Sequence, residues 1–360
     1  MRTTDTRVRR AIASVAAGRP VVVTSDIAHD NQGYLAFAAE AATPELLAFT
    51  VRHTSGYVRV ALPGSECARL NLPPMCHNDS GRLGAGAHRV TVDSIGTGTG
   101  ISASDRAATI AALAAEHSAA SNFRRPGHVV PVEVTVGGVL GWPGPSEAAV
   151  DLARLAGRRE AGVLCDIVSR DHPTAMARGS ELVEFAVQHG LAIVSIDELV
   201  AYRRRTEPQV ARLAETVLPS RGGGFRAIGF RDLHRGGEHV AVIIGEAGAG
   251  VPVPLHVHVE CLTGDVFGST ACRCGGELDS ALTAMAAQRN GVIVYLRPPG
   301  PVQACGLFDQ TDASSEWVSQ TTAWILRDLG VYTLRLSDDT PGFGLVIFGA
   351  IREHGLRAAG

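Results

Sequence analysis

Three cysteines that lie close together in the chain offer the clearest chemistry. Cys261, Cys272 and Cys274 fall within the stretch ECLTGDVFGSTACRCG, residues 260–275. Cysteine thiolates at short spacings are typical zinc ligands, and a catalytic zinc keeps its fourth position for a water molecule. The alternative is that the three cysteines are small buried residues that hold no metal. The spacing predicts a zinc site, retained either for chemistry or for structure.

Two histidines just upstream are further candidate ligands. His256 and His258 alternate along an expected strand, and Glu260 continues the same face. One of these side chains could take the fourth zinc position in place of water. We favour a simpler arrangement, in which one histidine faces a pocket and the other packs, because Cys261 should point to the opposite face of the strand.

Composition limits the remaining interpretations. The 360 residues, of which 45% are hydrophobic, are enough for two domains of ordinary size. A net charge of -3 gives no electrostatic footprint for nucleic acid. The chain has no run of about 18 apolar residues and no convincing signal-peptide cleavage site, so we expect a soluble cytoplasmic protein without a membrane partner. Seven cysteines, an odd number, favour reduced thiols over a disulfide framework.

Apolar runs of strand length alternate with helical patterns, which predicts mixed α and β structure. Residues 21–25 and 192–197 are expected strands, and residues 145–157 an expected helix that Ser146 caps and a glycine closes. The polar residues 202–215 are the expected linker, so the predicted domains are residues 1–205 and 206–360. The second domain is expected to contain strands at 225–230, 239–245, 251–260 and 292–297 and a helix at 276–291.

Longer motifs in both halves resemble known families. The N-terminal half resembles 3,4-dihydroxy-2-butanone 4-phosphate synthase through LNLPPM, TGTGISASDRAATIAAL, FRRPGHVVPV and SEAAVDLARLAG. The C-terminal half resembles GTP cyclohydrolase II through RAIGFRD, VHVECLTGDVFGSTACRCGGELDSAL and GVIVYLR. Together these motifs follow the order of the fused bifunctional riboflavin-pathway proteins. The resemblance implies an α+β protein with an N-terminal α/β domain, a zinc-binding C-terminal α+β domain and a homodimer with its N-terminal sites at the subunit interface.

The resemblance also locates an N-terminal site. Where the synthase family has an acidic loop, this chain reads SDIAHDNQGY, residues 25–34. Arg59 stands at the family's reactive cysteine position, and Asp166 replaces a late glutamate. We predict the catalytic set His29, Asp30, Tyr34, Arg59 and Asp166. The predicted substrate-binding residues are Asp26, Gln32, Trp142 and Ser146.

Two replacements bear on the magnesium ions that the synthase family uses. In WPGPSEA, residues 142–148, Pro145 stands where the family has a metal-binding histidine, and proline offers no lone pair to a cation. Trp142 replaces an arginine that grips the substrate phosphate, which leaves the Ser146 hydroxyl. Mg²⁺ binding is therefore expected to be weakened. His128 of the RPGH motif is interpreted as structural, and the TGIS loop, residues 99–102, as shaping the pocket.

The cyclohydrolase half shows similar replacements. The family's nucleotide loop appears as PPGPVQACGL, residues 298–307, and its catalytic D-L-R stretch matches Ser315-Glu316-Trp317. A basic phosphate contact is replaced within SDDTPG, residues 337–342. These changes predict a zinc-binding scaffold without GTP cyclohydrolase activity.

We therefore expect a repurposed N-terminal enzyme, a lyase or isomerase acting on a small polar or sugar-derived substrate in specialised metabolism. One alternative is an authentic dihydroxybutanone phosphate synthase and GTP cyclohydrolase II of riboflavin synthesis. Another is a non-catalytic dimeric regulatory paralogue. Convergence of His29, Asp30, Arg59 and Asp166 on a closed pocket would favour an enzyme over a paralogue without activity.

Overall fold

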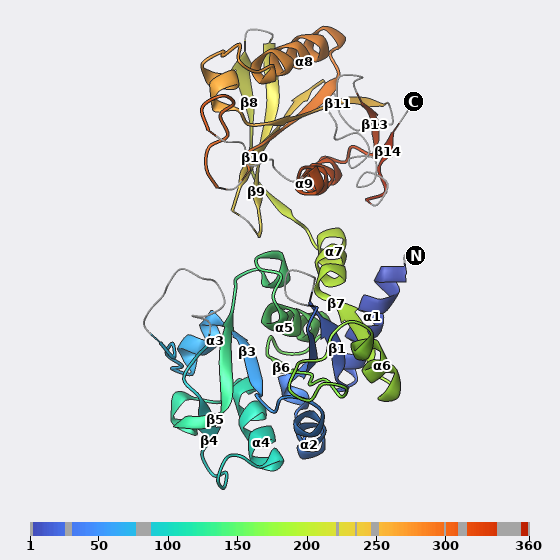
Figure 1. Ribbon diagram of the computed structural model, residues 1–360. Helices are drawn as coiled ribbons and strands as arrows, with labels where there is room; N and C mark the ends of the chain where they lie inside the picture. The colour runs from blue at the N-terminus through green and yellow to red at the C-terminus, as the bar shows by residue number, and fades with distance from the viewer. Residues whose placement is uncertain are drawn as a thin grey trace. The chain divides into compact units, whose positions relative to one another are not determined.

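A computed structural model gives the architecture of two compact units, Met1–Arg203 and Arg204–Gly360 (Figure 1). The structure describes residues 3–25, 31–76, 88–220, 223–234, 236–245, 252–298, 300–308, 315–336 and 354–358. Each unit holds one seven-stranded mixed sheet with helices against it. The structure thus has the α+β architecture with two domains that the sequence predicts.

The sheet of the first unit has the strand order β4-β5-β3-β6-β2-β1-β7. β3 and β5 are parallel, as are β1 and β7, whereas the other neighbouring pairs are antiparallel. The strands are β1 Val21–Thr24, β2 Gly33–Ala38, β3 Arg59–Pro63, β4 Val92–Ser94, β5 Phe123–Val134, β6 Gly162–Asp166 and β7 Ala192–Ser195. In this arrangement the start of β3, the end of β6 and the start of β2 meet at one edge of the sheet.

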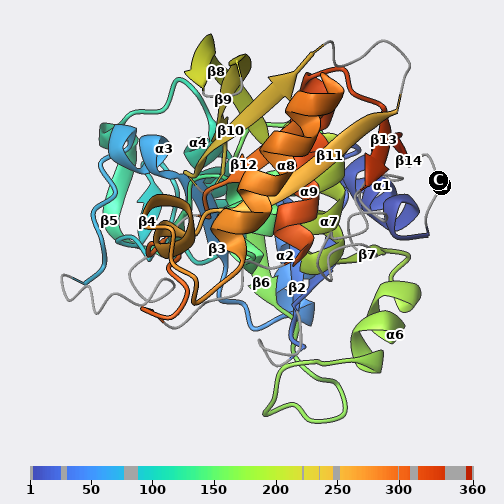
Figure 2. The same cartoon turned by 90° about the horizontal axis from the view of Figure 1, so that it is seen from above.

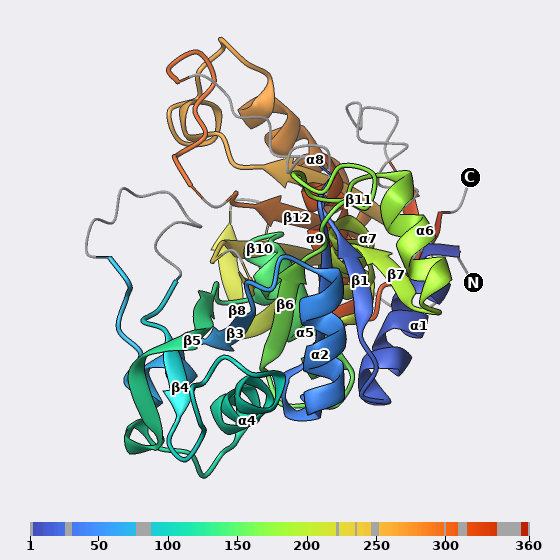
Figure 3. The ribbon, with the colours of Figure 1, turned by 60° about the horizontal axis from the view of Figure 1, so that its bottom comes forward.

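Helices cover both faces of this sheet because its strands are apolar on both sides. Val21 and Val23 pack with α1 and α5 on one face, whereas Val22 packs with α6 on the other. Figure 3 shows α2 and α4 on the same side as α6. The helices are α1 Thr3–Ala16, α2 Pro44–His53, α3 Gly64–Arg69, α4 Ala103–Ala114, α5 Pro145–Leu155, α6 Ser180–Gln188 and α7 Ile196–Thr206, with short turns η2 Ala39–Ala41, η3 Ala120–Asn122 and η4 Gly138–Leu140.

The sheet of the second unit has the order β14-β13-β11-β12-β10-β9-β8. β8, β9, β10 and β12 form an antiparallel series, and β12, β11, β13 and β14 run parallel. The strands are β8 Val210–Ser220, β9 Gly223–Asp232, β10 Glu238–Ile244, β11 Val253–Val259, β12 Gly291–Leu296, β13 Thr333–Leu336 and β14 Arg357–Ala358. The parallel half of the sheet carries the loops of interest, because β11 and β12 end at the same edge.

Two helices cover opposite faces of the second sheet. Val292 and Val294 of β12 pack with α9, Ser315–Asp328, whereas Ile293 packs with α8, Cys274–Gln288. α8 lies across the face nearest the viewer in Figure 2. A single π-helical turn, η5 Leu262–Val266, joins β11 to the segment before α8.

Several expected boundaries need correction. The helix expected at 276–291 ends at Gln288, and Gly291 already begins β12. Ser146 does not cap α5, because the helix already begins at Pro145, whose fixed φ suits the first helical position, and Gly144 is the cap residue. The strand expected at 192–197 ends at Ser195. There Ser195 and Glu198 form a reciprocal capping box, with hydrogen bonds of 3.1 Å in each direction, and α7 begins.

The expected linker at 202–215 is also wrong. α7 continues to Thr206 and β8 begins at Val210, so only residues 207–209 connect them. The charged stretch looked like a linker because arginines are usually solvated. Arg203 is instead buried, with its guanidinium 2.6 Å from the buried Asp151 carboxylate.

Within the part of the chain that the structure describes, no helix combines the length and apolar character needed to cross a bilayer.

Candidate functional sites

The first candidate site lies at the edge of the first sheet where β2, β3 and β6 meet. Arg59, the first residue of β3, donates from Nη2 to Asp166 Oδ2 at 2.7 Å. Asp166 ends β6 and pairs in register with Tyr34 of β2. The Arg59 guanidinium carbon lies 5.6 Å from the centre of the Tyr34 ring. Three of the five predicted catalytic residues therefore lie together, on three adjacent strands.

Tyr34 is held as a neutral phenol at this edge. Burial raises its pKa, the Asp166 carboxylate raises it further, and the Arg59 guanidinium opposes them. The hydroxyl donates to Gln32 Oε1 across a long 3.5 Å contact, so it keeps the capacity to donate to a bound molecule. Arg59 Nε is buried and has no hydrogen-bond partner among the described residues. The Tyr34 hydroxyl is thus a donor that a ligand oxygen can satisfy, whereas Arg59 Nε is enclosed by protein atoms.

The other predicted residues of this site divide into two groups. Asp26, His29 and Asp30 lie outside the described residues. The segment that contains them is flanked by Ser25 and Gln32, which are joined by a backbone hydrogen bond of 2.9 Å. Trp142 and Ser146 lie before and within the first turn of α5, a helix that packs on β2 and β6. Among the described residues, no hydrogen bond or ion pair joins these two side chains to Arg59 or Asp166, which pair with each other.

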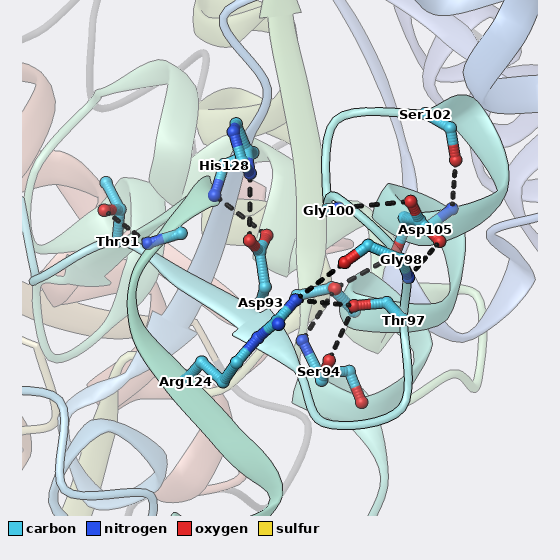
Figure 4. A network of polar contacts seen from close by, with 12 residues as sticks. Thr91, Asp93, Ser94, Thr97, Gly98, Gly100, Ser102, Asp105, Arg124 and His128 are labelled. Carbon is cyan, nitrogen blue, oxygen red and sulfur yellow. Dashed lines mark hydrogen bonds and ion pairs between the residues drawn. The ribbon is translucent and has the colours of Figure 1, made fainter.

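A histidine interpreted as structural turns out to have a more distinctive setting (Figure 4). His128 of β5 places Nδ1 2.9 Å from Oδ2 of the buried Asp93, while its backbone N–H donates to the other carboxylate oxygen at 2.9 Å. The His128 side chain is 40% exposed, so a carboxylate orients an accessible imidazole. This is the arrangement of a general base. Because β5 adjoins β3, His128 lies on the strand next to the one that carries Arg59, and Asp93 lies on β4, on the other side of β5.

The loop around Asp93 explains the glycine-rich TGTGIS sequence. Gly100 has φ +86°, and a Cβ there would lie 2.1 Å from the Asp93 carboxylate. Asp105 accepts hydrogen bonds from Gly98 N and Gly100 N, both at 3.1 Å, and Ser102 caps α4 (Figure 4). The loop therefore shapes the surroundings of Asp93.

The second candidate site is a cluster of four cysteines in the second unit. Their Sγ atoms all lie within 4.8 Å of one another: Cys261, Cys272, Cys274 and Cys305. Cys261 follows β11, and Cys305 lies in the loop after β12. Cys274 is the first residue of α8, and Cys272 lies two residues before it. The three predicted ligands are thus brought together. The sequence analysis missed Cys305. Its loop follows β12, which is parallel to β11, so the loops after both strands begin at the same end of the sheet.

The cluster fits a soft divalent cation. Burial raises the pKa values of the Cys274 and Cys305 thiols. Burial also opposes ionisation of Cys261, but hydrogen bonds from Thr263, Cys305 and Gly264 outweigh it and lower the pKa of that thiol to about 6. Several thiolates in one small space require a positive charge among them, and a set of four sulfur ligands suits Zn²⁺.

A carboxylate behind the cluster fixes Cys261. Asp265 accepts from Cys261 N at 2.9 Å, from the Tyr295 hydroxyl at 2.7 Å and from His258 Nε2 at 3.0 Å. His258 is buried and stacked on Tyr295, whereas His256 lines the neighbouring cavity. One histidine faces a pocket and the other packs, as we predicted.

That cavity has a volume of about 1320 Å³. It lies between β11, η5 and α8, and Cys272 belongs both to its wall and to the cysteine cluster. Arg273 and Arg335 supply positive charge, and Glu277 supplies a carboxylate. A cavity of this size holds a molecule as large as a nucleotide.

Residues 315–317, which match the catalytic D-L-R stretch of the cyclohydrolase family, do not line this cavity. They begin α9, and Trp317 is buried against the opposite face of the sheet. The SDDTPG stretch lies outside the described residues.

Comparison with known proteins defines the class of protein. The family model of 3,4-dihydroxy-2-butanone 4-phosphate synthase matches residues 9–202, and that of GTP cyclohydrolase II matches residues 211–342. Riboflavin biosynthesis protein RibBA of Rhodococcus erythropolis is 46% identical over 94% of this chain and 87% of its own length. RibBA of Salinispora arenicola is 45% identical over 97% of this chain and 89% of its own.

Solved structures support the relation to the synthase and the two-domain architecture. RibBX of A. baumannii, described as a two-domain 3,4-dihydroxy-2-butanone 4-phosphate synthase, has a TM-score of 0.71 and 33% identity, covering 95% of this chain and 96% of that one. A 3,4-dihydroxy-2-butanone 4-phosphate synthase in complex with two magnesium ions is 37% identical, with a TM-score of 0.52, over 56% of this chain and 97% of its own. The chain belongs to the family of two-domain riboflavin biosynthesis enzymes that join these two domains.

This similarity corrects the predicted function. The expectations of a changed substrate, a role in specialised metabolism and a lost GTP cyclohydrolase activity are wrong, because riboflavin biosynthesis proteins match nearly the whole chain at about 45% identity. The prediction gave too much weight to single replacements such as Pro145 and Gln32. The alternative interpretation, an authentic riboflavin-pathway enzyme, is the one that the comparisons favour.

Proposed function

We propose that the first unit converts ribulose 5-phosphate to 3,4-dihydroxy-2-butanone 4-phosphate and formate, and that the second unit opens the guanine ring of GTP. Both reactions would supply riboflavin synthesis. The observation that carries the proposal is that both family models match this chain, the synthase first and the cyclohydrolase second. A riboflavin biosynthesis protein is also similar to it over almost the full chain. The predicted domain limits, 1–205 and 206–360, are part of this proposal.

In the first unit the edge of β2, β3 and β6 supplies the donors. Arg59 and Tyr34 would hold developing negative charge on the substrate ketone oxygen, and Asp166 would fix the Arg59 guanidinium. His128, oriented by Asp93, is suited to take up a proton from carbon. Mg²⁺ is the proposed cofactor, which would polarise the ketone, and we propose the carboxylate of Asp30, one of the predicted catalytic residues, as its ligand.

In the second unit the cysteine cluster would hold Zn²⁺ beside the cavity that takes the nucleotide. Cys272 connects the two, and Arg273 and Arg335 are placed to attract phosphate oxygens. We further propose a cytoplasmic homodimer. Asp26, Gln32, Trp142 and Ser146 are proposed to bind the substrate, and His29 is proposed to take part in catalysis.

Two separate assays on the full-length protein test the proposal. Formate release from ribulose 5-phosphate with Mg²⁺ should be readily measured and should fall at least about tenfold in Asp166→Asn, which leaves the Arg59 guanidinium without its carboxylate. Glu238→Gln, which alters an exposed ion pair with Arg231, should leave formate release unchanged.

The activity proposed for the second unit, opening of the guanine ring of GTP, is measured as a loss of guanine absorbance in the presence of Zn²⁺. Absence of formate release would refute the function of the first unit alone, and absence of GTP conversion that of the second alone.

A further inference from the structure

The cysteine cluster contains one more thiol than a zinc site with a bound water requires. We propose that Cys305 is the fourth zinc ligand and closes the coordination shell of the metal. The inference rests on zinc binding as proposed above, and it concerns a residue that lies 31 positions beyond Cys274 in a different loop. Neither its spacing nor its flanking sequence, PVQACGL, marks it as a ligand.

The distances between sulfur atoms match a tetrahedron. A metal surrounded by four thiolates at about 2.3 Å has sulfur atoms about 3.8 Å apart along each edge. Cys261 Sγ lies 3.8 Å from Cys272 Sγ, and Cys274 Sγ lies 3.7 Å from Cys305 Sγ. Two opposite edges of the tetrahedron therefore have the expected length, and every other edge is at most 4.8 Å. A fourth ligand position is filled by sulfur.

The Cys305 loop is tied to the ligand loop by contacts that need no metal. Leu262 N donates to Gln303 O at 2.8 Å, and Thr263 Oγ1 donates to Cys305 O at 3.0 Å. Ala304, next to Cys305, is fully buried. The Cys305 thiol is therefore positioned by the fold itself and does not reach the cluster by chance.

The other candidate for the fourth position is already engaged. His258 Nε2 faces the Asp265 carboxylate at 3.0 Å, and the ring stacks on Tyr295. His256 faces the cavity and is not part of the cluster. Among the described residues, Cys305 is the ligand that completes the set with Cys261, Cys272 and Cys274.

A consequence follows for the proposed hydrolysis of GTP. Four thiolates leave no coordination position for water, whereas activation of water requires an open one. Cys305 must therefore leave the metal before water can bind to it. In the closed arrangement its loop is held by the hydrogen bonds at Gln303 O and at the Cys305 carbonyl.

Cobalt substitution tests the inference without an activity assay. The Co²⁺-loaded full-length protein should show tetrahedral d–d bands, and Cys305→Ser should lose about one quarter of the thiolate-to-cobalt charge-transfer absorbance, because one of four thiolates is removed. Zinc affinity, measured by competition with a chromophoric chelator, should fall at least about tenfold. Cys76→Ser, which removes an exposed cysteine outside the cluster, is the matched control and should change neither quantity.

A charge-transfer band that is unchanged in Cys305→Ser would overturn the inference and indicate three thiolates with water. If that variant does not fold, alkylation of the wild-type protein tests whether Cys305 binds zinc. Iodoacetamide should label Cys305 only after a chelator removes zinc, and labelling that is equally fast with zinc bound would overturn the inference. A four-thiolate spectrum without GTP conversion would refute only the proposed function of the second unit. GTP conversion with a three-thiolate spectrum would refute only the role of Cys305.

Discussion

The pairing of Asp93 with His128 shows how a buried carboxylate defines the chemistry of an exposed imidazole. Asp93 accepts both the backbone N–H and the ring of the same residue, so the ring cannot rotate without losing a hydrogen bond. The carboxylate also favours the tautomer with the proton on Nδ1, which leaves Nε2 as the accepting nitrogen. A proton on substrate carbon would meet a base that is already oriented.

Asp93→Asn should therefore lower the rate of formate release about 100-fold or more, because an amide can stabilise the wrong tautomer and cannot stabilise the imidazolium. Steady-state assays over a range of pH would measure the loss. Asp105→Asn is the control, since Asp105 supports the same loop through Gly98 N and Gly100 N without contacting His128. Equal losses in both variants would show that Asp93 matters only for loop structure.

At the scale of elements, the two faces of the second sheet differ in their chemistry. The face toward α8 borders the cavity and the cysteine cluster, whereas the face toward α9 is a closed apolar core. His239 of β10 is buried there, edge-on to Trp317, and its Nδ1 accepts from Arg297 N at 3.3 Å. Burial lowers the pKa of His239 to about 4, with Asp232 opposing the shift. Burial likewise lowers the pKa of His354 to about 4.

Because both histidines have lowered pKa values, we expect the free energy of unfolding to fall in acid. An unfolded histidine titrates near pH 6.5, so below that pH the unfolded chain takes up protons that the folded state refuses. The stabilising contribution is complete above about pH 6.5 and is lost progressively as the pH falls from about 6.5 to 4, by about 3 kcal/mol for His239. Urea unfolding at several pH values should show this decline in the second unit.

His239→Gln keeps an acceptor for Arg297 N and should remove roughly half of the decline, because His354 would still contribute. His117→Gln, at an exposed position, should not alter the decline. An unchanged pH dependence in His239→Gln would mean that other groups control acid stability.

At the scale of the whole molecule, the two units have separate hydrophobic cores. Removal of zinc by a zinc-selective chelator, with Mg²⁺ kept in the buffer, should therefore act on the second unit only. Hydrogen exchange after chelation should rise in η5, at the start of α8 and at residues 303–308, and stay constant across the sheet of the first unit. Mass spectrometry of the full-length protein measures both regions in one experiment, and increased exchange in the first sheet would contradict the prediction.

The sequence predicted most of this architecture but only part of each site. Cys261, Cys272 and Cys274 were recognisable because local spacing carries the signal. Cys305 was not, because its approach depends on β11 and β12 being parallel neighbours. The same holds for Asp93 and His128, which are 35 residues apart and meet only through the pairing of β4 with β5. Sequence periodicity predicts elements, whereas contacts between elements need the register of the sheet.

The sulfur atoms of the cluster approach one another in two pairs, Cys261 with Cys272 and Cys274 with Cys305. If zinc departs, hydrogen peroxide can oxidise each pair of thiols to a disulfide and is itself reduced to two molecules of water. Each bond would require the two sulfur atoms to close to about 2.05 Å. A doubly oxidised cluster has no thiolate left to offer, so zinc could return only after a cellular reductant had reopened both bonds. The arrangement that suits a tetrahedral metal thus also makes metal loss under oxidative stress persistent.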